Sequence, residues 1–229
     1  MHRRNYKQFC GLARALDVVG ERWTMLIVRN LLLGPLRYSD LLRGLPGITT
    51  NLLAKRLKEM EDAALIERIE SAGVGAAYRL TDHGAGLEPA VHALGRWGWK
   101  QMSVPVKGEH RSFDYLMVSL RRRYLGDAHV RAELVADGTP YRIILAGRRA
   151  EIVRGDVASP DIRLRGPGAS LARVFLDHAS RKRLPADIIV EGSAESLGAL
   201  LGAFATSDDD PALVAASGRS KRRRASHPE

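Results

Sequence analysis

The sequence has little cysteine and no long hydrophobic run. Cys10 is its single cysteine, which excludes an internal disulfide and is typical of a reducing cytoplasm. No stretch approaches the ~20 apolar residues that a membrane helix needs, since residues 25–33, the best candidate, contain an arginine and an asparagine. Residues 1–4 could begin a signal peptide, but Arg14 and Asp17 interrupt the apolar stretch behind them and no small-residue cleavage site follows. We expect a cytoplasmic protein with neither a signal peptide nor a membrane partner.

Acidic residues are outnumbered, with 26 Asp and Glu against 36 Lys and Arg and a net charge of +10. This excess makes a polyanion the first partner to consider, although charge by itself does not identify one. Residues 1–103 hold 15 basic and 10 acidic side chains, residues 104–208 hold 16 and 13, and residues 209–229 hold 5 and 3. The last segment concentrates its bases at 221–224, among small residues that cannot form a core. We expect a disordered, solvated basic tail there, with a nucleic-acid-binding arm as the alternative.

The first 103 residues alternate helical periodicity with strong breakers. Apolar residues recur at spacings of three and four over residues 9–19, and a second helix over 22–33 ends at Gly34 and Pro35. After these we expect an extended piece at 36–38, a short helix capped by Ser39 and a turn at 46–47. A helix should then run from an N-cap at Thr49 to residue 63. Two β-like segments at 65–70 and 77–81 and a last helix from residue 81 or 82 to 99 complete the order. This order is typical of a winged helix-turn-helix DNA-binding domain.

The helix predicted after Thr49 has two distinct faces. At about 100° per residue, the apolar stripe holds Leu53, Leu57, Met60 and Ala64, and the opposite face holds Asn51, Lys55 and Lys58. An amide can pair bidentately with adenine, and an ammonium group can reach guanine or a phosphate. The polar face therefore suits a DNA major groove. The alternative is that Lys55 and Lys58 only solvate the surface, with nearby carboxylates at 59, 61 and 62 as partners. Those acids lead us to expect contact over the first two helical turns.

Other candidate DNA contacts flank this face. They are Ser39, Thr49, Thr50, Arg56, Arg68 and Arg79. The threonines can donate to phosphate or touch a thymine methyl group, and Arg56 is placed to the side of the helix for a backbone phosphate. Arg68 and Arg79 lie on the two hairpin strands, from which they could reach phosphates. The hairpin tip, residues 71–77, has no basic residue for a minor groove.

Several motifs resemble the HxlR family of bacterial transcriptional regulators. They are Cys10-Gly11-Leu12-Ala13-Arg14-Ala15-Leu16-Asp17, Gly20-Glu21-Arg22-Trp23-Thr24-Met25-Leu26-Ile27, Leu33-Gly34-Pro35-Leu36-Arg37-Tyr38-Ser39-Asp40-Leu41 and Leu45-Pro46-Gly47-Ile48. With the helix at 53–61 they cover about residues 8–100. The resemblance implies a dimeric winged-helix DNA binder, usually a repressor, with its first and last helices at the dimer interface. Here those helices carry Leu12, Leu16, Leu94, Trp97 and Trp99. From the residues alone, the two tryptophans could equally cover the core of one monomer.

The resemblance also draws attention to Cys10. Some members of the family sense oxidants or electrophiles through a cysteine at the start of the first helix, which is where Cys10 stands. A helix N-terminus and the nearby Lys7 would lower the pKa of its thiol. Without a second cysteine, a switch would need a disulfide between subunits or a small-molecule adduct. The alternative is a small, buried and unreactive side chain. The tip of the predicted wing, residues 71–77, has no basic residue and so departs from the basic wings that are common in the family.

The second half predicts a linker at 104–108 and a small α+β domain at 109–208. We expect helices at 113–124, 169–179 and 193–204, and strands at 130–135, 141–146, 150–154, 161–165 and 187–191 in a sheet of antiparallel type. The first helix should leave residues 121–123 mostly outside its apolar face. The element order, with residues 160–164 before the second helix and 188–192 after it, resembles the sterol-carrier-protein fold. That implies a pocket for a hydrophobic ligand, with candidate lining residues Leu171, Val174, Phe175, Leu197, Leu201 and Phe204. The alternative is that several of these side chains simply fill a core.

The sequence shows no catalytic constellation. Its seven histidines have no metal-ligand spacing with carboxylates or Cys10, and residues 166–168 lack a phosphate-loop pattern. We expect no metal, no cofactor and no enzyme activity. The sequence therefore predicts a homodimeric, sequence-specific transcriptional regulator, most simply a repressor, that binds a double-stranded DNA operator and whose C-terminal domain takes up a hydrophobic effector. The alternative is a lipid carrier or an enzyme in which the winged-helix domain is an interaction module.

Overall fold

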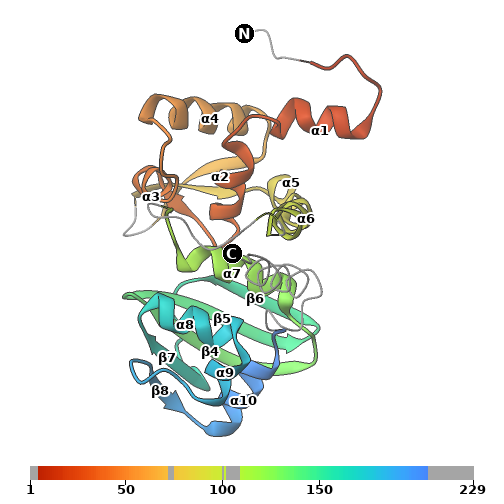
Figure 1. The fold of residues 1–229 in the computed structure, drawn as a ribbon. Coiled ribbons are helices and arrows are strands. Elements are labelled where there is room, and N and C mark those ends of the chain that lie inside the picture. Colours follow the sequence, from red (N-terminus) through yellow and green to blue (C-terminus); the bar gives the residue numbers. More distant parts are fainter. Residues whose placement is uncertain (1–4, 72–74, 100, 102–108, 206–229) are drawn as a thin grey trace, which may run out of the picture. The chain divides into compact units, whose positions relative to one another are not determined.

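The computed structural model describes residues 5–71, 75–99, 101 and 109–205 (Figure 1). Contacts divide the chain into two compact units, residues 1–91 and 92–229, and each is described by itself. The linker predicted at 104–108 and the basic tail predicted at 209–229 lie outside the described residues. The domain boundary expected at residue 103 stays a prediction. No helix in the described part of the chain is long and apolar enough to cross a membrane.

The first unit has the element order of a winged helix-turn-helix domain. Its elements are α1 (Gly11–Val19), α2 (Thr24–Leu31), β1 (Leu36–Arg37), α3 (Tyr38–Arg43), α4 (Thr50–Asp62), β2 (Ile66–Ser71), β3 (Gly75–Leu80), α5 (Asp82–Ala85) and the start of α6 (Glu88–Trp99). Strand β3 lies between β1 and β2, and both pairs are antiparallel. The predicted winged-helix order is confirmed.

The core of this unit is built mainly from α2, α3 and α4. Ile27 and Leu31 of α2, Leu41 of α3, and Leu53 and Leu57 of α4 are all buried in one cluster. Their spacings of three and four residues place them on one side of each helix. Packing of these stripes against each other and against the small sheet leaves the opposite side of α4 exposed to solvent. The fold thus presents a helix face to a partner while its other face holds the domain together.

Turn chemistry sets where these helices begin and end. Gly34 and Gly47 have φ of +111° and +91°, a backbone region that glycine adopts readily. Thr49 caps α4 as expected, its Oγ1 accepting a hydrogen bond from the Leu52 amide at 3.3 Å. Ala64 has φ of +52°, lies beyond the end of α4 and is exposed, so its predicted place in the buried stripe is wrong. Leu65, the next residue, is buried instead.

Two predicted features of this unit are corrected. Ser39 does not cap α3, because the helix already begins at Tyr38 and Arg37 occupies the N-cap position. The single helix expected to run to residue 99 is two helices, α5 and α6. Pro89 explains the break, since its ring nitrogen has no hydrogen to donate to a carbonyl of the preceding turn. Thr81 caps α5 through the Gly84 amide, so the predicted cap at Thr81 is confirmed.

The second unit is a mixed α+β domain. After the last part of α6 it contains α7 (Phe113–Arg123), β4 (Ala128–Ala136), β5 (Thr139–Gly147), β6 (Arg149–Arg154), β7 (Ile162–Gly166), α8 (Gly168–Leu176), α9 (His178–Lys182), β8 (Ile189–Gly192) and α10 (Ala194–Gly202). The strand order in its sheet is β6-β5-β4-β7-β8. All neighbouring strands are antiparallel except β4 and β7, which are parallel, so the sheet is mixed rather than purely antiparallel.

One face of this sheet is covered by helices and the other is more exposed. Along β5, Tyr141, Ile143 and Leu145 are buried while the residues between them are more exposed, which is the alternation of a strand with one covered face. Helices α7, α8 and α10 contact β6, β7 and β4 (Figure 1). Phe175 of α8 packs edge-on against Phe204 with ring centroids 5.9 Å apart. The helices therefore close the core over one side of the sheet.

Two further predictions fail in this unit. Arg123 is buried rather than outside, because it follows Leu116 by seven residues and Leu120 by three and so lies on the same buried stripe of α7. The helix expected at 169–179 is divided at Asp177, whose backbone is extended. Its carboxylate accepts hydrogen bonds from the amides of Ala179 and Ser180 at 3.1 Å and begins α9.

Candidate nucleic-acid interface

The start of α4 is held by two hydrogen bonds from outside the helix. Thr49 caps it, and the phenol of Tyr38 donates to the Thr50 carbonyl at 2.6 Å. Because Tyr38 opens α3, this second bond joins the two helices of the helix-turn-helix at the end of α4 where Asn51 stands. Sequence reasoning missed this anchor, and periodicity contains no signal for it, since it links a side chain to a backbone atom in another element.

The exposed side of α4 carries the predicted polar face. Thr50, Asn51, Lys55 and Lys58 are exposed, whereas Leu53, Leu57 and Met60 are buried. The structure thus brings Asn51 and Lys55 onto one solvent-facing surface over the first two turns. Their exposure is what contact with a base edge or a phosphate requires.

The two lysines of this face differ in how firmly they are held. Lys55 Nζ is 4.0 Å from a Glu59 carboxylate oxygen, a loose pair between half-exposed side chains. Lys58 Nζ is 2.7 Å from Asp62 Oδ1, and this hydrogen bond raises the pKa of Lys58 above its ordinary value. Lys58 must give up that carboxylate to reach a phosphate, whereas Lys55 is open to do so. The electrostatics therefore favour contact near the N-terminal end of α4.

The structure contradicts the predicted role of Arg56. It was expected at the side of α4, open to a phosphate, but its side chain is only 8% exposed. Its Nη2 atom is 3.0 Å from Glu21, in the turn before α2, and its Nη1 atom is paired with Glu59. Arg56 follows Leu53 by three residues and so lies on the buried side of the helix. It joins α4 to α2 and is withdrawn from the phosphate-contacting set.

The wing offers fewer free cations than its sequence suggests. Arg79 Nε is 2.7 Å from Glu67 Oε1, across the β2–β3 pair in which these residues face each other. Arg68 is exposed and stands opposite Tyr78. Residues 72–74 at the hairpin tip lie outside the described residues. Ser39 is exposed on α3. Arg68 and Ser39 remain open to a phosphate, and Arg79 is engaged within the hairpin.

Large apolar side chains are exposed on α1 and on α6. Leu12 is 68% exposed and Leu16 less so on α1, while Leu94 and Trp97 are 56% and 66% exposed on α6. Trp99 is half-buried. Trp97 therefore does not cover the core of its own unit, which was the alternative role. Cys10 is exposed at the N-cap of α1 and makes no capping hydrogen bond, so the alternative of a buried thiol is wrong as well.

The residues predicted to line a ligand pocket form a core in this structure. Leu171, Val174, Phe175 and Phe204 are almost completely inaccessible, Leu201 is buried and Leu197 is half-buried. A cavity of about 260 Å³ in this unit is lined by other residues: Tyr124, Leu125, Gly126, Asp127 and Arg148. Within the part of the chain that the structure describes, no group of three or more His, Cys, Asp or Glu side chains is arranged to hold a metal ion.

The comparisons with known proteins concern the first unit. Residues 18–105 match the model of the HxlR-like helix-turn-helix family. The HTH-type transcriptional regulator YvaP of Bacillus subtilis is 34% identical over 96 residues, which are 41% of this chain and 89% of that protein. YodB of the same organism, an HTH-type transcriptional regulator, is 33% identical over 85 residues, covering 36% and 76%. A crystal structure of an HTH-type regulator, ytcD, is 31% identical with a TM-score of 0.38 and covers 41% of this chain and 97% of that one.

These relatives are transcriptional regulators rather than enzymes, and the alternative of a carrier or an enzyme is not favoured. Such a domain needs a helix with an exposed polar face and a buried apolar stripe, followed by the strands of a wing. The structure has these features in α4 and in the strands β2 and β3. The chain belongs to the HxlR-like helix-turn-helix family and is a DNA-binding transcriptional regulator.

Proposed function

We propose that the protein is a homodimeric repressor that reads a palindromic operator with the first two turns of α4. The observation that carries this proposal is the placement of Asn51 and Lys55 on the exposed side of a helix whose other side is buried and whose first residues are anchored. A helix held in this way can enter a major groove without first paying the entropy of ordering its own end. The remaining polar residues then divide by role.

Asn51 is the residue we assign to base reading. Its amide can donate to and accept from the major-groove edge of adenine, and a good bidentate contact discriminates against other bases by about 1–3 kcal/mol. Lys55, Thr49, Thr50, Ser39 and Arg68 are assigned to guanine or to phosphates, which set position and affinity. Lys58 and Arg79 contribute only if they exchange their carboxylate partners for phosphate.

Exposed apolar side chains on α1 and on α6 support the proposed dimer. Leu12, Leu94 and Trp97 are 56–68% exposed, and clustered apolar side chains on a protein surface mark an interaction site. A second copy would cover α1 and α6 and place two α4 helices on half-sites about one helical turn of DNA apart. Leu12, Leu16, Leu94, Trp97 and Trp99 are the residues assigned to this interface.

A genome-wide footprint followed by gel shifts on the recovered sites tests the DNA-binding proposal. We expect one palindromic sequence, and Asn51→Ala should lower the ratio of specific to non-specific affinity at least tenfold. Lys58→Gln is the matched control on the same helix and should change that ratio little. Uniform, sequence-blind binding that disappears at moderate salt would overturn the proposal.

For the second unit we propose a sterol-carrier-protein-like domain that takes up a hydrophobic effector. Support comes from its element order. The buried side chains of α8 and α10 would have to separate to admit a ligand. A long-chain fatty acid that neither raises the melting temperature of the full chain nor shifts its operator affinity would refute this proposal.

We propose Cys10 as an oxidant-responsive thiol because it is exposed at the N-cap of the helix assigned to the dimer interface. Diamide should produce a covalent dimer on a non-reducing gel, and Cys10→Ser should remove it. Operator binding that responds to diamide equally in Cys10→Ser would show that the thiol has no sensing role.

A further inference from the structure

A surface cavity of about 300 Å³ adjoins α4 within the first unit. The turn before α2, the turn between α3 and α4, and the first two turns of α4 form its wall. Its size is at the lower end of the range for small-molecule sites. Neither the DNA-reading face nor the apolar surface assigned to the dimer uses these residues, so the cavity has no role in the function described so far.

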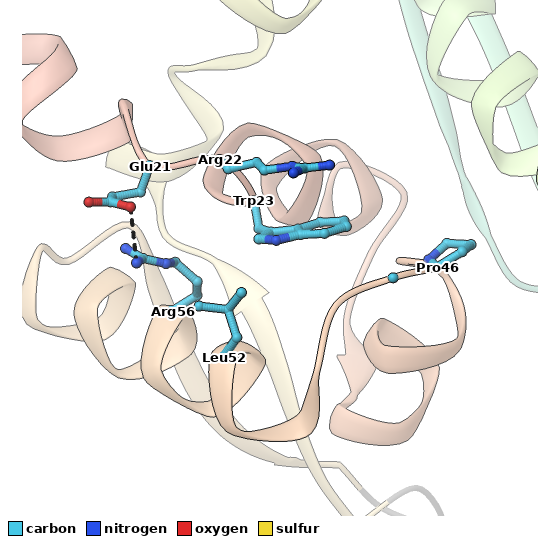
Figure 2. A pocket seen from close by; sticks show the side chains of 7 residues that line it. Glu21, Arg22, Trp23, Pro46, Leu52 and Arg56 are labelled. Atoms are coloured by element: carbon cyan, nitrogen blue, oxygen red, sulfur yellow. Dashed lines mark ion pairs between the residues drawn. The ribbon is translucent and has the colours of Figure 1, made fainter.

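The apolar part of the wall is flat. Figure 2 shows the indole ring of Trp23 between the side chains of Arg22 and Leu52, with Pro46 beyond its edge. The Cζ atom of Arg22 lies 5.4 Å from the centre of the indole ring, a cation–π arrangement that holds one face of the ring in place. A planar aromatic ligand matches such a wall, because ring faces and edges pack against indole and aliphatic groups over a large area.

The charged part of the wall is cationic in sum. Two guanidinium groups, Arg22 and Arg56, and one carboxylate, Glu21, line the cavity. Figure 2 shows that Arg56 points at Glu21, whereas Arg22 extends along the indole ring of Trp23. Among the described residues, no carboxylate lies within ion-pair distance of Arg22. Glu21 is half-exposed and pairs with Arg56 at 3.0 Å, while Glu59 pairs with the other side of the same guanidinium. A ligand carboxylate can therefore replace Glu21 beside Arg56. The buried guanidinium then keeps a carboxylate partner, and the released Glu21 carboxylate is solvated by water.

We propose that this cavity binds a flat aromatic monocarboxylate and that its occupancy is coupled to DNA binding. The ring lies against Trp23 and Leu52, and the carboxylate takes the place of Glu21 beside Arg56. The coupling rests on the proposed function of α4: Leu52 and Arg56 belong to that helix, and Trp23 lies just before α2, so the ligand bridges the two elements whose relative position sets the DNA-reading face.

Calorimetric titration of the full chain with 2-naphthoate, in the absence of DNA, tests the site. We expect saturable binding of one molecule per chain, and binding of the neutral isostere 2-naphthamide should be at least tenfold weaker, because the amide cannot make the charge-assisted contact. Equal affinity for the two compounds, or no saturable binding of 2-naphthoate at millimolar concentration, would overturn the proposal.

Two single substitutions should change the affinity for 2-naphthoate in opposite directions. Glu21→Gln removes the competing carboxylate and should tighten 2-naphthoate binding severalfold, whereas Arg22→Gln removes a cation from the wall and should weaken it. Glu70→Gln is the matched control, since Glu70 is an exposed acid on β2 outside the cavity and its loss changes the net charge by the same amount. If Glu21→Gln and Glu70→Gln behave alike, the anion does not bind at Arg56.

Gel shifts on the operator measure the coupling separately. Saturating 2-naphthoate should change operator affinity by fivefold or more, the lower end of ordinary allosteric coupling. Ligand binding with unchanged operator affinity would refute the regulatory role of the cavity. A protein that binds 2-naphthoate but recognises no operator would instead refute the proposed function of α4, and the two failures are distinguishable because the titration contains no DNA.

Discussion

The Nη2 atom of Arg56 lies 3.0 Å from Oε2 of Glu21, so a basic residue in the middle of α4 binds the turn before α2 instead of a phosphate. A phosphate contact would be lost with Arg56→Ala, and the slope of log affinity against log salt would fall by about one unit. We expect this slope to stay unchanged. The free energy of unfolding should fall by about 1–2 kcal/mol, through lost packing of the long side chain and its ion pairs.

Lys55→Gln is the comparison for this measurement. Lys55 is exposed and only loosely paired, so its removal should lower the salt slope while leaving the urea midpoint nearly unchanged. A reduced slope for Arg56→Ala with unaltered stability would show that Arg56 leaves Glu21 when DNA is present.

The N-cap of α4 gives a second prediction. Thr49→Ala removes the acceptor for the Leu52 amide and should lower the free energy of unfolding by about 1 kcal/mol. Thr50→Ala is the matched control, because Thr50 is exposed inside the first turn and alanine is a better helix former. Urea denaturation of both variants measures the difference. If the two variants are equally stable, the hydrogen bond from the Leu52 amide to Thr49 does not stabilise α4.

The exposed leucines of α1 give a third prediction. Leu12→Glu places a charge in the apolar surface assigned to the dimer and should shift the protein to a monomer in sedimentation experiments. Operator affinity should fall with it, because two linked half-site contacts become independent. Arg14→Glu, on the other side of the same helix, should leave the sedimentation coefficient unchanged. A monomeric wild-type protein would contradict the prediction directly.

Glu133 gives a prediction about pH. Burial favours the neutral form of this carboxyl, but the hydrogen bond from the Val157 amide at 2.8 Å and the pairing with Arg163 at 2.6 Å outweigh it and lower its pKa below the ordinary value. A carboxyl with a lowered pKa in the folded state stabilises the fold above its unfolded pKa, and that stability is lost as the pH falls through the folded value.

Glu133→Gln should therefore reduce stability at neutral pH by about 2–3 kcal/mol, since it leaves a partly buried arginine with one carboxylate fewer. The stability of this variant should also fall less steeply than that of the wild type between pH 5 and the folded pKa of Glu133, which lies below about 4.5. Thermal melts over that range check both effects. Parallel pH profiles for the two proteins would show that Glu133 does not titrate in this way.

Local signals in the sequence determined the order of elements, the cap at Thr49 and the division of α4 into a polar and an apolar face. Each of these depends on residues within about one or two helical turns of each other, and such neighbours determine helix periodicity, capping and turns. Pro89 shows that a local signal can also be overlooked, since it marks the break between α5 and α6 without help from the rest of the fold.

Only the tertiary structure decided which polar residues of these helices are free. Glu21 and Arg56, and likewise Tyr38 and Thr50, lie on different elements and meet when those elements pack. Arg123 is buried for a similar reason, because its stripe faces the interior of the second unit. The helical pattern predicts on which side of the helix a side chain lies. The residue that it contacts on that side belongs to a distant part of the chain and is determined by the packing of the elements. Its charge and its position at the side of the predicted helix had marked Arg56 as a candidate for DNA, and packing pairs it with Glu21 and Glu59 instead.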